Sequence, residues 1–323
     1  MNHKKLLKYL KIFLPLALGV FFIYYSYSKF SVQERETLIK NISNIDSIWI
    51  VLTLTGGLLS HMSRAYRWKL LMQPMGYKIR FSTAFMGVMA GYLANLGIPR
   101  SGEVLRGATA ATYENIPFQK AFGTIIAERA VDVVVVLIIV TIAILMQTQE
   151  LYLLFDKYDI NPWLSLLGII VLILIGVFTL IFIKKSDWFI FIKIKKFTTG
   201  ILEGVKSVFH MKKTGAFIAH TIFIWGMYIS MFFILKFAFT EMYDLSFSTM
   251  LAAFVVGSFS MSITSGGLGV YPVAVGATLA LFGVSNEVGE AFGWTDWGLQ
   301  TALTVVIGGL SLLLLPLLKR KED

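Results

Sequence analysis

Three charged residues follow a proline in an otherwise apolar region of the chain. Arg100, Glu103 and Arg106 recur every third residue after Pro99, so a helix that begins after this proline carries them as one stripe. The planar guanidinium of arginine binds phosphate oxygens in a bidentate manner, which makes the stripe a candidate contact for a lipid headgroup, with Glu103 orienting the two arginines. The alternative is an ion-paired stripe that closes a loop at the membrane surface.

A second charged group lies inside a long apolar segment. Glu128, Arg129 and Asp132 follow Lys120, and Glu128 lies about 12 Å further along the helix axis, within the hydrocarbon. Glu128 and Asp132 share one helix face, and Arg129 can reach Asp132. Buried carboxylates of this kind suit an amine or a coupling proton. The alternative is an ion-pair clamp between helices.

The elements that must position these residues are helices interrupted by proline and glycine. Pro99 cannot continue a helix and Gly102 permits unusual backbone angles, so the apolar segment from Phe81 should break after Asn95. A second apolar segment, from Phe247, is interrupted by three glycines: Gly266, Gly267 and Gly269. We include Asn95 and these glycines among the candidate substrate-binding residues, with helix capping and close helix packing as the alternatives.

The composition defines the class of protein. Of the 323 residues, 56% are hydrophobic and 15% are charged, and the mean hydropathy is +0.73. Several apolar runs are long enough to cross a bilayer, so we predict an all-α membrane protein, a polytopic helical bundle. There is no cysteine and the four histidines lack metal-ligand spacing, so we expect no metal or other cofactor. The net charge of +10 resides at the ends of apolar runs, which indicates topology signals and argues against a nucleic-acid partner.

The basic residues also predict the topology in the cell (inner, cytoplasmic) membrane, with both termini cytoplasmic. We expect six spans, at about residues 12–27, 47–71, 121–147, 163–183, 215–239 and 297–318. Two further apolar segments would violate the positive-inside rule if they crossed fully, so we predict two broken re-entrant hairpins, 81–118 and 247–284. The lysine-rich segment 184–213 is then an amphipathic cytoplasmic helix, and Asp296 belongs to an external loop.

The predicted topology contains an internal symmetry. Residues 1–150 and 151–323 each contain three spans and one re-entrant hairpin, but they start from opposite sides of the membrane. We therefore predict two inverted repeats. In secondary transporters of this architecture, paired broken helices hold the substrate near the middle of the membrane, and helix N-termini there favour an anionic group.

Other polar and aromatic residues have simpler interpretations. Arg64 and Arg67 are expected to be positive-inside anchors at the cytoplasmic end of their span, and the alternative is that one of them points into a cytoplasmic vestibule. Lys236 is expected to extend to the external surface, and Trp294 and Trp297 are expected at the lipid interface.

Four motifs extend over nearly the whole chain: Arg64-x-x-Arg67-Trp68, Asn95-x-x-x-Pro99-Arg100-x-Gly102-Glu103-x-x-Arg106, Glu128-Arg129-x-x-Asp132 and Gly266-Gly267-Leu268-Gly269-Val270. Together they resemble the flippase-like transmembrane region of the lysylphosphatidylglycerol synthase family, the multiple peptide resistance factor type. The resemblance implies a membrane domain that moves or handles a polar lipid, such as an aminoacylated phosphatidylglycerol, between leaflets.

The chain departs from the family pattern in two respects. The family tends to have proline before the glycines and often an acid after them, where this chain has Thr264, Ser265 and Tyr271-Pro272. Synthase members also carry a soluble aminoacyl-transfer domain after the membrane region, and this sequence ends at Asp323, so we expect no lipid aminoacylation by this chain.

We therefore expect a transporter, not an enzyme, that translocates a polar (anionic or aminoacylated) lipid headgroup between leaflets. Its partner would be a membrane phospholipid or a polyprenyl-phosphate lipid. The first alternative is a membrane enzyme acting on such lipids, with Glu128 or Asp132 as base, although no nucleotide motif, metal cluster or nucleophile–base pair supports it. The second is a non-catalytic subunit that scaffolds a lipid-modifying enzyme partner.

Overall fold

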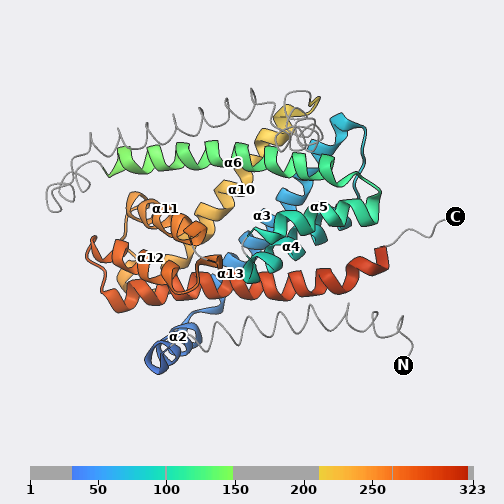
Figure 1. Cartoon of the computed structure of the whole chain (residues 1–323). Coiled ribbons are helices and arrows are strands. Elements are labelled where there is room, and N and C mark those ends of the chain that lie inside the picture. The colour runs from blue at the N-terminus through green and yellow to red at the C-terminus, as the bar shows by residue number, and fades with distance from the viewer. Residues whose placement is uncertain (1–30, 99, 148–210, 264, 319–323) are drawn as a thin grey trace, which may run out of the picture.

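In a computed structural model, the protein is all-helical over the residues that the structure describes, which are 31–98, 100–147, 211–263 and 265–318 (Figure 1). Its α-helices are α2 (Val32–Asn44), α3 (Ser47–Met72), α4 (Phe81–Gly97), α5 (Ser101–Glu114), α6 (Phe118–Met146), α10 (Thr214–Leu235), α11 (Phe247–Ile263), α12 (Val270–Ala280) and α13 (Asn286–Leu314). Short 3-10 turns join or extend them: η1 (Gln73–Met75), η3 (Lys236–Ala238), η4 (Thr240–Met242), η5 (Ser265–Gly267) and η6 (Leu315–Leu318). The predicted spans 12–27 and 163–183 and most of the basic segment 184–213 lie outside the described residues.

Three helical segments in the described part of the chain are long and apolar enough to cross a membrane: Phe118–Met146, Thr214–Ala238 and Asn286–Leu318. They correspond to three of the predicted spans, although the last one begins well before Trp297. The 26-residue helix α3 is not among them, because polar residues that include Arg64 and Arg67 lower its hydropathy. With the shorter apolar helices, these segments give the fold of a polytopic helical membrane protein.

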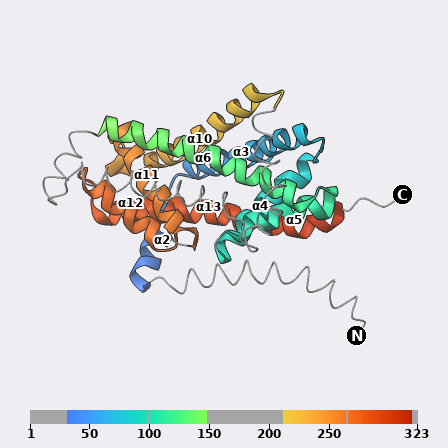
Figure 2. The same cartoon turned by 45° about the horizontal axis from the view of Figure 1, so that its top comes forward.

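The long helices α6 and α13 extend along the molecule, and two pairs of shorter helices lie toward its opposite ends (Figure 1 and Figure 2). One pair is α4 and α5, and the other is α11 and α12. The pairs meet at their turns, since a Cβ atom on Gly266 in η5 would lie 3.1 Å from Cδ2 of Leu96 near the end of α4. The two helix interruptions therefore contact each other.

The turn between α4 and α5 is built by short polar and small residues. Oδ1 of Asn95 accepts a 2.7 Å hydrogen bond from the backbone N–H of Gly102, a group that the start of a helix would otherwise leave unpaired. Gly102 also lies against Gly91, because a Cβ atom on Gly91 would be only 2.9 Å from the Gly102 carbonyl oxygen. Arg100 adopts a left-handed conformation with φ of 64°, which is unusual for a residue other than glycine.

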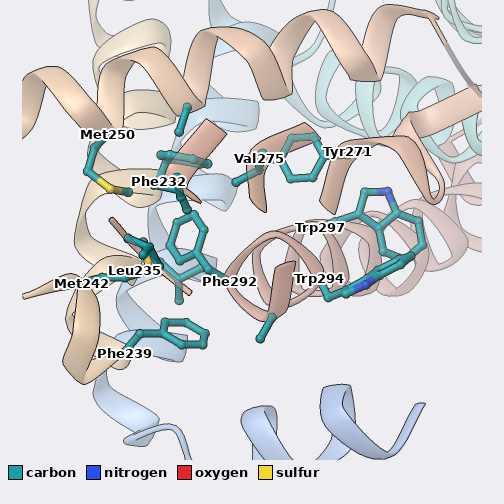
Figure 3. Close-up of a cluster of buried hydrophobic side chains, with 14 of the residues drawn as sticks. Phe232, Leu235, Phe239, Met242, Met250, Tyr271, Val275, Phe292, Trp294 and Trp297 are labelled. Carbon is teal, nitrogen blue, oxygen red and sulfur yellow. The ribbon is translucent and has the colours of Figure 1, made fainter. Parts of the chain in front are cut away.

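The largest apolar core among the described residues joins α10, α11, α12 and α13 and is rich in aromatic rings (Figure 3). The rings of Phe232 and Phe292 meet edge to face, with their centroids 4.9 Å apart. Trp294 and Trp297 are each only 6% exposed within this core, so the prediction that they lie at the lipid interface is wrong. Nε1 of Trp297 donates a 2.6 Å hydrogen bond to the carbonyl of Gly266, as a buried indole requires a partner. This bond fastens η5 to α13.

Two ionisable residues that were expected at the external surface are buried. Lys236 is 4% exposed, and its Nζ donates to the carbonyl oxygens of Tyr243 at 2.8 Å and Leu245 at 2.6 Å. It therefore closes the loop after α10 and does not extend to water. Asp296 is 5% exposed, because α13 already begins at Asn286 and carries it into the protein interior.

Replacing Gly102 by alanine should destabilise the protein, because the new Cβ atom would overlap the Gly91 carbonyl and overpacking typically costs about 1–3 kcal/mol. Gly226→Ala in α10 is the control, since nothing lies within 4 Å of a Cβ atom there and alanine is the better helix former. Thermal unfolding in detergent measures both effects. Equal melting temperatures for the two variants would contradict the close approach of α4 and α5.

Candidate functional site

Five charged side chains are buried together where α3, α5 and α6 meet, each at most 6% exposed. We call them the buried ion cluster; its members are Arg64, Arg67, Arg106, Glu128 and Asp132. Three guanidinium groups face two carboxylates. The cluster therefore carries one positive charge that no member compensates.

Glu128 is shared by three arginines. Its Oε1 accepts hydrogen bonds from Nη1 of Arg64 at 2.9 Å and from Nη2 of Arg67 at 3.0 Å. Its Oε2 accepts a bond from Nη2 of Arg106 at 2.7 Å. The two carboxylate oxygens of Glu128 thus connect α6 to α3 and α5.

Asp132 lies one helical turn further along α6 and completes the network. Its Oδ2 accepts from Nη1 of Arg64 at 2.8 Å, and its Oδ1 accepts from Nη1 of Arg67 at 2.8 Å. Because Arg64 and Arg67 occupy both oxygens, the predicted contact with Arg129 does not form. Nη2 of Arg129 instead donates to Oε1 of Glu103 at 2.7 Å, so the predicted stripe on α5 pairs with α6 and not within itself.

The interpretation of Arg64 and Arg67 as positive-inside anchors is wrong. Their spacing places both on the face of α3 that turns toward α6, where buried carboxylates supply the countercharge. Arg67 also donates to Oγ1 of Thr221 in α10 at 3.1 Å, and Nη2 of Arg64 lies 3.4 Å from the hydroxyl of Tyr228. Two arginines on one face of an apolar helix are a sequence signal for burial inside the protein.

Trp68 also belongs to the site, and the motif that contains it was the only sign of this. The guanidinium carbon of Arg106 lies 4.1 Å from the centre of the Trp68 ring, a cation–π contact. The indole is fully buried, and its Nε1 donates to Oγ1 of Thr124 at 2.9 Å. The ring thereby fixes the direction in which Arg106 approaches Glu128.

A small cavity adjoins the buried ion cluster. Six of the residues that line it are polar or aromatic: Arg64, Tyr92, Asn95, Glu103, Arg106 and Arg129. Four of these were predicted as substrate-binding residues, and the structure brings them together. The cavity measures about 10 Å³, roughly the volume that one water molecule requires. Among the described residues, no group of three His, Asp or Glu side chains is placed to hold a metal ion.

The remaining predicted site residues do not line this cavity. Arg100 is exposed and forms no ion pair or hydrogen bond with the described residues. Gly266, Gly267 and Gly269 form the interruption between α11 and α12, where their φ angles of 66°, 79° and 73° suit glycine. Their role in the structure is to shape the turn that meets α4.

Long apolar helices around a buried charged network define a multi-pass helical membrane protein. Residues 12–317 match the family described as Lysylphosphatidylglycerol synthase TM region, so the chain belongs to that family. The resemblance predicted from the motifs is confirmed, and the family is associated with lipid-related membrane function.

One relative among curated proteins is also similar. The chain is 26% identical to the UPF0104 membrane protein MJ1595 of Methanocaldococcus jannaschii over 144 residues, which are 43% of this chain and 42% of that protein. The match therefore spans less than half the length of that relative. No solved structure matches the chain.

Glu128→Gln should strongly destabilise the protein, because it leaves three guanidinium groups with one carboxylate. Removing one partner of a buried ion pair costs about 3–5 kcal/mol. Glu103→Gln is the matched control: its partner Arg129 is 43% exposed, and a partly exposed pair contributes about 1 kcal/mol or less.

The double variant Arg106→Gln/Glu128→Gln leaves two arginines and one carboxylate in the cluster, so the net charge of the cluster is again +1, as in the wild type. It should therefore recover part of the loss seen in Glu128→Gln. Thermal unfolding in detergent compares the variants. A melting temperature for Glu128→Gln equal to that of Glu103→Gln would contradict the shared carboxylate as the centre of the cluster.

Proposed function

We propose that the protein translocates a polar lipid headgroup between the membrane leaflets and catalyses no covalent reaction. The observation that carries this proposal is the excess of one positive charge in the buried ion cluster, counted over the described residues, beside a cavity lined by α3, α4, α5 and α6. A buried excess charge is costly. The phosphate of a phospholipid or polyprenyl-phosphate lipid would supply the missing negative charge, while the acyl or prenyl tails stay in the bilayer.

An internal repeat in the sequence supports a transporter architecture. Three tripeptides occur twice in the same order: Phe-Ser-Thr at 81–83 and 247–249, Gly-Ala-Thr at 107–109 and 276–278, and Ala-Phe-Gly at 121–123 and 291–293. Their copies fall in α4 and α11, in α5 and α12, and in α6 and α13. They favour two repeats, one in residues 1–150 and one in 151–323, which the positive-inside rule orients oppositely with both termini cytoplasmic.

The proposal treats α4–α5 and α11–α12 as re-entrant hairpins that enter from opposite faces of the membrane. The contact between Gly266 and Leu96 supports it, because hairpins that enter from opposite sides and reach the middle of the membrane bring their turns together there. Interrupted helices that meet near the middle of the membrane expose backbone N–H groups to a substrate.

The cavity must enlarge before a headgroup can enter, since it now holds about one water molecule. The ion pair between Glu103 and Arg129 is a partly exposed part of the lining, and its separation would open the path toward Arg106. Arg100, exposed at the turn, would meet the phosphate first. This structure then corresponds to the closed state of the proposed cycle.

The alternative of a membrane enzyme has less support. A general base needs a free carboxylate oxygen within reach of the proton that it removes. Every oxygen of Glu128 and Asp132 already accepts a hydrogen bond from an arginine. Neither side chain is available as a base in this arrangement.

Arg106→Gln should strongly slow headgroup transfer without unfolding the protein, because it leaves two arginines balanced by two carboxylates. The loss of a charge-assisted contact of about 1.5–3 kcal/mol corresponds to roughly tenfold or more in rate. The measurement is leaflet exchange of headgroup-labelled phosphatidylglycerol, aminoacylated phosphatidylglycerol and polyprenyl phosphate in reconstituted vesicles. Lys213→Gln, which removes an exposed positive charge, is the control.

Exchange by the wild type and the control, but not by Arg106→Gln, would support the proposed path. Exchange that is unchanged in Arg106→Gln would exclude the cluster as the phosphate contact. If no lipid of the three classes exchanges faster than in protein-free vesicles, autonomous transport fails. The scaffold for a lipid-modifying enzyme then becomes the better hypothesis, and copurification of that enzyme is the test.

A further inference from the structure

The second half of the chain contains a buried carboxyl group that no cation compensates. Asp296 in α13 is 5% exposed, and its Oδ2 accepts a 2.5 Å hydrogen bond from the hydroxyl of Tyr271 in α12. Its Oδ1 has no hydrogen-bond partner, and it forms no ion pair within the described part of the chain. Glu128 and Asp132 differ from it, because arginines contact all of their oxygens.

The surroundings of Asp296 are apolar and aromatic. Trp294 and Trp297 flank it along α13 and belong to the largest apolar core (Figure 3). Among the described residues of the helices that pack against α13, Tyr271 is the titratable group that contacts the Asp296 carboxyl group. The Tyr271 ring is itself held against α11, since a Cβ atom on Gly257 would lie 2.8 Å from its Cε2 atom.

Burial without a countercharge couples ionisation to conformation at this position. A carboxylate in apolar surroundings is costly, so burial favours the neutral acid. The ionised form requires water around Oδ1, and water gains access when α12 separates from α13. Binding of one proton to the carboxylate then accompanies closure, and release of that proton accompanies opening.

Asp296 lies beside the second helix interruption, which connects it to the proposed lipid path. Tyr271 is in the first turn of α12, directly after η5, and Trp297 bonds to the Gly266 carbonyl within η5. Gly266 contacts Leu96 of α4, the helix that contributes Asn95 to the cavity. Movement of α12 would therefore reach α4 through a continuous series of contacts.

We propose that Asp296, positioned by Tyr271, is a proton-binding site whose protonation is coupled to closure, and whose deprotonation is coupled to opening, of the path between the helix pairs. The ligand is a proton, and it would act as the co-substrate of lipid translocation. The coupling rests on the proposed function, whereas proton binding by Asp296 does not.

Infrared difference spectra of the purified protein between acidic and alkaline pH test proton binding alone. The wild type should show a carboxylic-acid C=O band that is lost in Asp296→Asn and shifted in Tyr271→Phe, which lacks the hydrogen bond. Asp244→Asn is the matched control, since Asp244 is exposed, and it should retain the band. A spectrum that Asp296→Asn leaves unchanged would overturn the proton site, whatever the lipid assay shows.

Vesicles with a pH difference across the membrane test the coupling. With one proton per lipid, a difference of about one pH unit should drive up to roughly tenfold asymmetry of the labelled lipid between leaflets. Asp296→Asn should lose this asymmetry, and Asp244→Asn should retain it. Asymmetry that persists in Asp296→Asn would overturn the coupling, and asymmetry driven by sodium at constant pH would overturn the proton as the ligand. Absence of all exchange in the wild type would count against the proposed function, and the infrared band would then decide the proton site by itself.

Discussion

The carboxylate of Glu128 is the point on which the described structure depends, because guanidinium groups from two other helices converge on it. Helices in a lipid environment gain little from burying apolar surface against one another, so specific polar contacts help to decide which faces meet. Arg64 and Arg67 fix the face of α3, and Arg106 fixes the face of α5. Once these three groups share one acid, the rotation of each helix about its axis is determined. Such networks contribute specificity of packing more than net stability.

The two halves of the protein resolve the problem of buried charge in different ways. The first half gathers three arginines around Glu128 and Asp132 and keeps one positive charge in excess. The second half buries Asp296 with a tyrosine hydroxyl as its partner and no cation in the described structure. The proposed anion site and the buried carboxyl group of Asp296 therefore lie beside the two helix pairs, α4–α5 and α11–α12, which touch at their turns. This is the arrangement expected when the charge of a bound group on one side must influence the other.

The sequence predicted the elements better than their contacts. Apolar runs and the interruptions around Gly102 and Gly266 located most of the described helices to within a few residues, because proline and glycine act on the local backbone; the exception is α13, which begins at Asn286, well before the predicted span. The partners of Arg64 and Arg67 could not be predicted in the same way. The carboxylates that pair with them are more than sixty residues away in the sequence. In an apolar membrane helix, the hydrophobic pattern also does not show which face contacts lipid and which contacts protein. Asp296 was misplaced because an acid near the start of a helix resembles one in a loop. The re-entrant hairpins and inverted repeats remain predictions.

The backbone at Arg100 bears on where a lipid phosphate would first bind. A left-handed conformation is unfavourable for a residue with a Cβ atom by roughly 1–2 kcal/mol, and glycine would adopt it without that cost. The Arg100 side chain is exposed and forms no ion pair or hydrogen bond with the described residues. Strain of this kind collects at functional sites, where the surrounding structure maintains it. Under the proposed function, this strain has an explanation: the exposed guanidinium at the turn is held where it can meet a ligand outside the fold, and a phosphate is a ligand that its planar donors suit.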